Sequence, residues 1–85
     1  MTCQQTEEIQ SKFSKELFEN LKDYGLDRIE FVADYAFGYN TACMVKTIDV
    51  NQYKQLELIC TLHEYGFRKT FHVVGTHYTA AITSY

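Results

Sequence analysis

The sequence has no long apolar stretch. Its apolar runs are only a few residues long, whereas a helix that spans a membrane needs about 20 consecutive apolar residues. The first residues, MTCQQ, also lack the basic and apolar regions of a signal peptide. We therefore expect a cytoplasmic protein that does not enter a membrane.

The cysteines form no regular pattern. The three cysteines, Cys3, Cys43 and Cys60, are odd in number and form no C-x-x-C pair. This pattern argues against a disulfide framework and favours reduced thiols. We expect Cys43 and Cys60 to be small, buried, hydrophobic residues.

The sequence also lacks the short motifs of common enzymes and metal sites. It contains no P-loop, dinucleotide-binding glycine pattern, nucleophile elbow, zinc-protease helix or EF-hand loop. His72 and His77 flank a predicted turn, but no third metal ligand is placed with them. Cys43 and His72 share one predicted sheet face, yet neither an oxyanion hole nor an orienting carboxylate accompanies them. We therefore expect a protein that is not an enzyme and holds no cofactor or metal.

Positive charge is sparse and forms no stripe. The net charge is -3, and acidic side chains outnumber basic ones up to Asp34, while the remainder is slightly basic. This distribution argues against nucleic-acid binding, which favours a basic surface. Aromatic residues on a sheet can nevertheless stack on bases, so a nucleic-acid-binding sheet domain is kept as an alternative.

The residues that are present indicate one folded domain. The chain is 46% hydrophobic and 22% charged, and its 85 residues support a single domain, 1–85, with a modest core. Apolar residues three and four apart predict a helix over 6–24 and a second one that starts at Asp49, a capping residue, and ends before Gly66. Alternating patterns predict four strands, at 29–35, 39–46, 70–74 and 77–83.

Two parts of the chain resemble each other. LKDYGL (21–26) and LHEYGF (62–67) both place a glycine where a helix can end in the left-handed conformation. In the later strands, TACM (41–44) resembles TAAI (79–82). We predict a duplicated αββ unit with pseudo-repeats at approximately 6–47 and 48–85.

These elements predict an α+β fold. A four-stranded antiparallel sheet with both helices on one face buries every apolar surface, and right-handed connections favour the strand order 1-2-4-3. This arrangement is a circularly permuted ferredoxin-like plait. Its edge strands carry charge, which discourages edge-to-edge pairing. The charged residues are Arg28, Glu30 and Asp34 at one edge and Arg68 and Lys69 at the other.

The alternation also predicts which residues face the helices. The inward set is Phe31, Ala33, Ala42, Met44, Phe71, Val73, Ala80 and Ile82. The outward set is Val32, Thr41, Cys43, Val45, His72, Val74, Thr79, Ala81 and Thr83. Because the outward set is apolar for a surface exposed to water, we expect a second copy of the chain or another protein to cover it. An ordinary threonine-rich sheet face is the alternative.

The candidate binding residues lie at the two predicted hairpins. They are Asp34, Tyr35, Phe37, Tyr39, His72 and His77. Aromatic side chains at a hairpin tip are common anchors in protein interfaces. The alternative is that Tyr35 and Tyr39 fold back over a helix end, in which case Phe37 alone would be exposed.

The leading functional hypothesis is a small non-enzymatic protein-binding module. It would act as an inhibitor or adaptor by occluding a partner's surface, as a phage-type inhibitor of a host or defence protein would. An acidic protein can block a basic site meant for nucleic acid, so the partner class is a nucleic-acid-handling enzyme or a defence complex. The alternative is a homo-oligomer, most simply a homodimer through the open sheet face, that binds a small ligand between its sheets.

Overall fold

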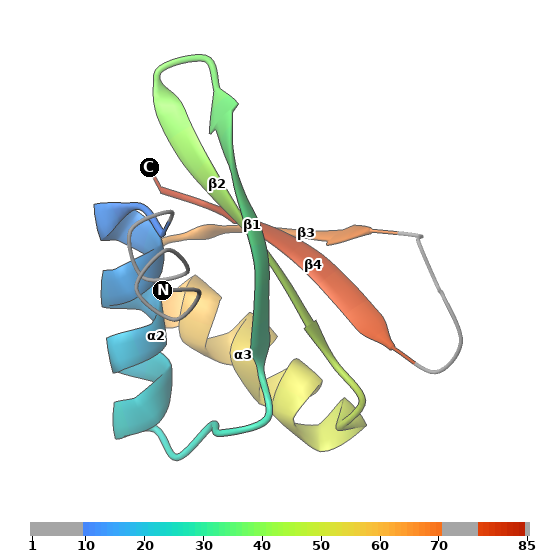
Figure 1. Cartoon of the computed structure of the whole chain (residues 1–85). Helices are drawn as coiled ribbons and strands as arrows, with labels where there is room; N and C mark the ends of the chain where they lie inside the picture. The colour runs from blue at the N-terminus through green and yellow to red at the C-terminus, as the bar shows by residue number, and fades with distance from the viewer. Residues whose placement is uncertain (1–9, 71–76, 85) are drawn as a thin grey trace, which may run out of the picture.

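The computed structural model describes residues 10–70 and 77–84. Its helices and strands are, in chain order, α2 (Lys12–Asp23), β1 (Glu30–Phe37), β2 (Asn40–Thr47), α3 (Val50–Leu62), β3 (Gly66–Thr70) and β4 (Tyr78–Thr83). The strands form one antiparallel sheet in the order β1-β2-β4-β3 (Figure 1). The predicted α+β class, strand order and edge strands are therefore confirmed.

Helix α2 starts later than predicted. Ser11 has an extended backbone, and its hydroxyl accepts a hydrogen bond from the backbone N–H of Ser14 at 3.1 Å. A serine in this position caps a helix because its oxygen satisfies a free amide of the first turn. The helix consequently begins at Lys12 and not at residue 6.

The C-terminal end of α2 is as predicted. Gly25 has a φ of +80°, the left-handed region that glycine enters without steric cost. The amide of Leu26 donates to the carbonyl of Leu21 at 2.9 Å, and the amide of Gly25 donates to the carbonyl of Lys22 at 3.0 Å. These two bonds form a complete Schellman motif.

Helix α3 ends with the same motif, but at a different residue. Glu64 takes the left-handed position, with a φ of 60°, and the amide of Tyr65 donates to the carbonyl of Cys60 at 2.8 Å. Gly66 is instead the first residue of β3. The prediction that Gly66 ends the helix was therefore wrong by two residues, and β3 begins four residues before its predicted start.

Because Glu64 takes the left-handed position at the end of α3, replacing glutamate by glycine should change the stability in opposite directions at Glu64 and at Glu16. Glu64→Gly should stabilise the protein by about 1 kcal/mol, because a left-handed conformation strains every residue that has a Cβ. Glu16→Gly, on the exposed side of α2, should cost about 0.5–1 kcal/mol by lowering helix propensity. Urea unfolding measures both values. A destabilised Glu64→Gly variant would mean that α3 continues through residue 64.

The predicted start of α3 at Asp49 is confirmed, but the side chain of Gln52 bonds to the loop before β1 and not to Asp49. Asp49 accepts a hydrogen bond from the amide of Gln52 at 3.0 Å, as a helix cap does. The side chain of Gln52 does not return the bond to Asp49. It accepts from the amide of Arg28 at 2.8 Å and donates to Asp27 at 2.9 Å, which lowers the pKa of the Asp27 carboxyl. Gln52 therefore ties α3 to the loop that leads into β1.

Both helices cover the same face of the sheet. In the two central strands Cys43 lies opposite Ile82 and Val45 opposite Ala80, and these four side chains are at most 1% exposed. They form a single buried cluster with residues of both helices, which are Leu17, Leu21, Tyr53, Leu56, Ile59 and Cys60. This cluster is the core of the protein.

The face assignment from sequence was right for β4 and wrong for β2. Ala80 and Ile82 face the helices as predicted. In β2, however, Cys43 and Val45 point toward the helices, and Met44, opposite Ala81, lies on the other face. A shift of one residue exchanges the two faces of a strand. The same exchange turns Thr41 inward and Ala42 outward.

A bulge changes the faces along β1. The pairing with β2 shifts between Phe31 and Ala33, so an extra residue interrupts the alternation. Phe31 packs against Phe18 on the helix side, as predicted. Ala33, expected inward, lies opposite Met44 on the other face. Predictions for 71–76, including His72, concern residues outside the described ranges.

The observed faces of β2 and β4 contradict the alignment of TACM (41–44) with TAAI (79–82). The match of TACM with TAAI equates Cys43 with Ala81, but Cys43 faces the helices and Ala81 faces away from them. These residues are not equivalent in the structure. The order αββ-αββ is present, while the duplication itself stays a prediction.

Candidate functional site

The candidate site is the sheet face opposite α2 and α3, together with the hairpin that extends from it. We call this surface the open face. The strand pairing assigns to it Glu30, Ala33, Tyr35, Asn40, Ala42, Met44, Lys46, Gly66, Arg68, Thr70, Thr79, Ala81 and Thr83. Most of these side chains are small or threonine, so the centre of the open face is shallow.

The β1–β2 hairpin carries exposed tyrosines. It projects from the body of the protein (Figure 1), and the pairing of Phe37 with Asn40 leaves a two-residue turn of Gly38 and Tyr39. Gly38 has a φ of +63°, which tight hairpin turns require. Tyr39 is fully exposed, which excludes the alternative that it folds over a helix end. The turn is shorter than the loop of residues 36–38 that the predicted strands left between them.

Tyr35 belongs to the open face. Its side chain is about half exposed, at 49%, and its hydroxyl lies 3.8 Å from the sulfur of Met44. Ala42 is its partner in the adjacent strand. Tyr35 thus connects the hairpin tip with the centre of the open face. The Phe37 side chain lies outside what the structure describes.

Asp34 has a different environment from the tyrosines. It lies on the helix side, where one carboxylate oxygen accepts from the Ser11 amide at 2.6 Å and the Ser14 hydroxyl at 3.2 Å. These bonds hold the start of α2 against the sheet. The structure therefore does not bring Asp34 together with Tyr35 and Tyr39, and its contacts are those of an anchor for the helix.

His77 is also separated from the tip. It is half-buried and directly precedes β4, whose first residue, Tyr78, lies opposite Thr47 at the far end of β2. The hairpin tip is at the other end of that strand. Of the candidate residues whose side chains the structure describes, only Tyr35 and Tyr39 lie in the same region.

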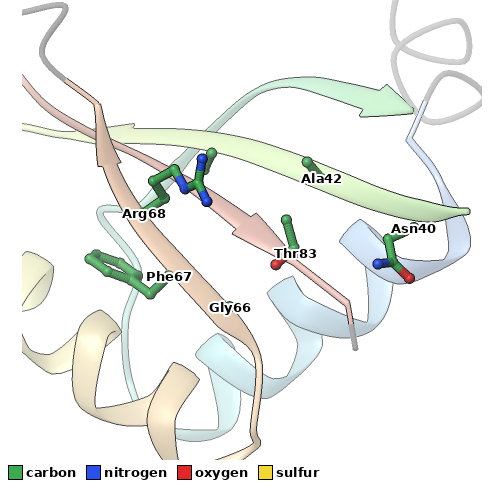
Figure 2. Close-up of a pocket in the computed structure, with 7 residues that line it drawn as sticks. Asn40, Ala42, Gly66, Phe67, Arg68 and Thr83 are labelled. Carbon is green, nitrogen blue, oxygen red and sulfur yellow. The ribbon is translucent and has the colours of Figure 1, made fainter. Parts of the chain in front are cut away.

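A hollow of about 190 Å³ lies on the open face, close to the hairpin. Ala42, Thr83 and Gly66 stand in one row across three strands, and their small size leaves this space. Figure 2 shows Arg68 toward one end of the hollow and Asn40 toward the other. The lining residues are Asn40, Ala42, Gly66, Phe67, Arg68, Ala81 and Thr83.

Sequence reasoning missed the hollow and the position of Arg68. It treated Arg68 only as an edge charge, because β3 was placed at 70–74. The alternation of Arg68 with Phe67, which packs against the core, is the signal that could have located this side chain on the open face.

The described cysteines are part of the core. Cys43 and Cys60 are completely buried, and burial raises the pKa of each thiol to about 12, with smaller contributions from Asp34 near Cys43 and Glu57 near Cys60. Both thiols are therefore protonated at neutral pH. The inward position of Cys43 also removes the geometry on which a nucleophile on the open face depended.

Within residues 10–70 and 77–84, no group of three or more His, Cys, Asp or Glu side chains is arranged to hold a metal ion. Over the same residues, neither helix is long and apolar enough to cross a membrane. Comparisons of the chain with protein-family models, with curated proteins and with solved structures found no match.

Proposed function

We propose that this chain is a small non-enzymatic protein-binding module that inhibits or adapts a partner by occluding its surface. The observation that carries the proposal is the pair of exposed tyrosines, Tyr35 and Tyr39, on a tight hairpin beside the open face. Tyrosine supplies a large apolar surface and a polar hydroxyl, and it is enriched at the energetic centres of interfaces. The strands of the hairpin are already paired up to its two-residue turn, so few backbone groups remain to be ordered on binding, which favours affinity.

The size of this hollow favours an inserted side chain over a small ligand on the open face. Sites for small molecules and cofactors usually measure about 300–1,000 Å³, whereas this hollow measures about 190 Å³. It therefore suits one inserted side chain of a partner. The homo-oligomeric ligand-binding protein is the second candidate, and it would need a second copy to enlarge the site.

We extend the proposal to the fold type of the chain, the class of its partner and its location. The strand order, with both helices on one face, supports a permuted ferredoxin-like plait that arose by duplication of an αββ unit. The net charge of -3 supports a partner with a basic site, such as a nucleic-acid-handling enzyme or a defence complex, in the cytoplasm. A phage-type inhibitor would combine these properties.

The test is capture of a partner from a lysate of the source cells, with matched variants. The Tyr35→Ala/Tyr39→Ala double variant should lose at least tenfold in affinity for the captured protein, because each interface aromatic contributes about 1–2 kcal/mol or more. Tyr24→Ala is the control, since Tyr24 is 47% exposed on the helix side and Tyr35 is 49% exposed. Equal loss with both variants would argue against a binding site at the hairpin.

Thermal unfolding and sedimentation complete this test. The double variant should keep the melting temperature nearly unchanged, because the tyrosines are outside the core. A dimer that the double variant weakens would support the homo-oligomer. A strict monomer at high concentration would exclude it.

A further inference from the structure

Arg68 is a cation on the open face that has no counter-charge among the described residues. It lies opposite Ala81 in β4, and its side chain is exposed. The two ion pairs among the described residues use other cations, since Arg28 pairs with Asp49 and Lys69 with Glu57. Within that part of the chain, the guanidinium of Arg68 has no carboxylate within ion-pair distance and donates no hydrogen bond.

The rest of the open face does not supply a counter-charge. Its one acidic residue, Glu30, lies opposite Lys46 at the other edge of the sheet. The remaining acidic side chains of the described residues are on the helices, in the loops or on the helix side of β1. The chain as a whole is acidic, yet its open face carries a net positive charge. Charge complementarity at this face therefore favours an acidic partner group.

The space beside Arg68 fits such a group. The small residues of the floor, Ala42, Gly66 and Thr83, leave the hollow open next to the guanidinium (Figure 2). Asn40, toward the other end, offers an amide that can donate further hydrogen bonds. Arginine binds carboxylates in a bidentate geometry that lysine does not reproduce.

We propose that the hollow receives an Asp or Glu side chain from an acidic segment of a partner protein, with Arg68 as its specificity-determining residue. This inference rests on the proposed function and gives the chemistry of the one partner segment that contacts the open face, which is separate from the basic site that the net charge of -3 favours elsewhere on the partner. The segment lies along the open face with its carboxylate against Arg68 and an adjacent residue against Tyr35, which shares the row of Ala42 and Thr83. The neighbouring tyrosines supply apolar contact, and the ion pair selects the segment.

The experiment is a selection of phage-displayed random short peptides on the wild-type protein, on Arg68→Gln and on Lys69→Gln. Peptides enriched on the wild type should share one Asp or Glu. Arg68→Gln should weaken them at least tenfold, and replacing the shared acid by its amide should weaken them to the same degree. Lys69→Gln removes the same charge from the next residue of β3, on the opposite face, and should bind like the wild type. Arg68→Lys should restore only part of the affinity.

Several outcomes would overturn the inference. They are enriched peptides without an acid, equal binding by Arg68→Gln, no enrichment, and inorganic phosphate or an oligonucleotide competing as strongly as the peptide. Self-association that Arg68→Gln abolishes would assign the face to a second copy instead. If neutral peptides bind and depend on Tyr35 and Tyr39, the proposed function stands while the acidic partner is excluded. If lysate capture fails as well, both are excluded.

Discussion

Replacing Val45 by Asp is expected to unfold the protein. Val45 is 1% exposed and lies in the centre of the sheet, opposite Ala80 and beneath the helices. An aspartate there would be a buried charge with no cationic partner in the core cluster, which costs about 3–5 kcal/mol or more. At roughly 0.05–0.15 kcal/mol per residue, a domain of 85 residues has a total stability of about 4–13 kcal/mol. The buried charge and the lost apolar burial of the valine, about 1.5–3 kcal/mol, together remove most or all of it. Circular dichroism should show a large loss of folded protein at room temperature.

The adjacent residue provides the matched control. Met44→Asp introduces the same charge one position earlier, on the open face, and should change the free energy of unfolding by no more than about 1 kcal/mol. The faces predicted from sequence would give the reverse result. Met44→Asp would then unfold the protein, and Val45→Asp would be tolerated. The pair therefore decides directly which face of β2 is buried.

Leu56→Ala is expected to lower the free energy of unfolding by about 2–5 kcal/mol. Leu56 is completely buried in the cluster that joins α3 to the sheet. Its truncation removes apolar contacts and leaves a cavity, and both effects destabilise a close-packed core. Chemical denaturation measures the difference, and the midpoint should fall without a change in the slope of the transition.

Leu58→Ala is the control on the same helix. Leu58 is two residues further along and is 70% exposed, so the same substitution should change stability by no more than about 0.5 kcal/mol. Similar losses at Leu56 and Leu58 would mean that α3 packs on the sheet with another face, or that a second molecule covers Leu58.

The correct predictions from sequence depend on local signals. Gly25 ends α2 because a glycine in the left-handed conformation completes its Schellman motif. Asp49 starts α3 because its carboxylate accepts from an amide of the first turn. With two helices and four strands placed in order, the handedness of connections restricts the sheet to few arrangements. The observed strand order is one of them.

The wrong predictions concern the faces of β1 and β2, which the pattern of a few neighbouring residues does not determine. Ala42, Cys43, Met44 and Val45 are all apolar, so alternation cannot choose between the two faces of β2. The bulge after Phe31 has no marker in the sequence, because it inserts an ordinary residue into β1. Each error moved side chains between the core and the open face, and this is why the candidate site was only partly predicted.

The sequence by itself determined the order of the helices and strands and the residues that end α2 and start α3, because capping and periodicity act between near neighbours in the chain. Only the tertiary structure decided the register, since the face of a strand depends on packing against the helices. It also decided that Glu64 ends α3 while the nearby Gly66 starts β3. The hollow beside Arg68 is formed by residues from three strands, and no local pattern could bring them together.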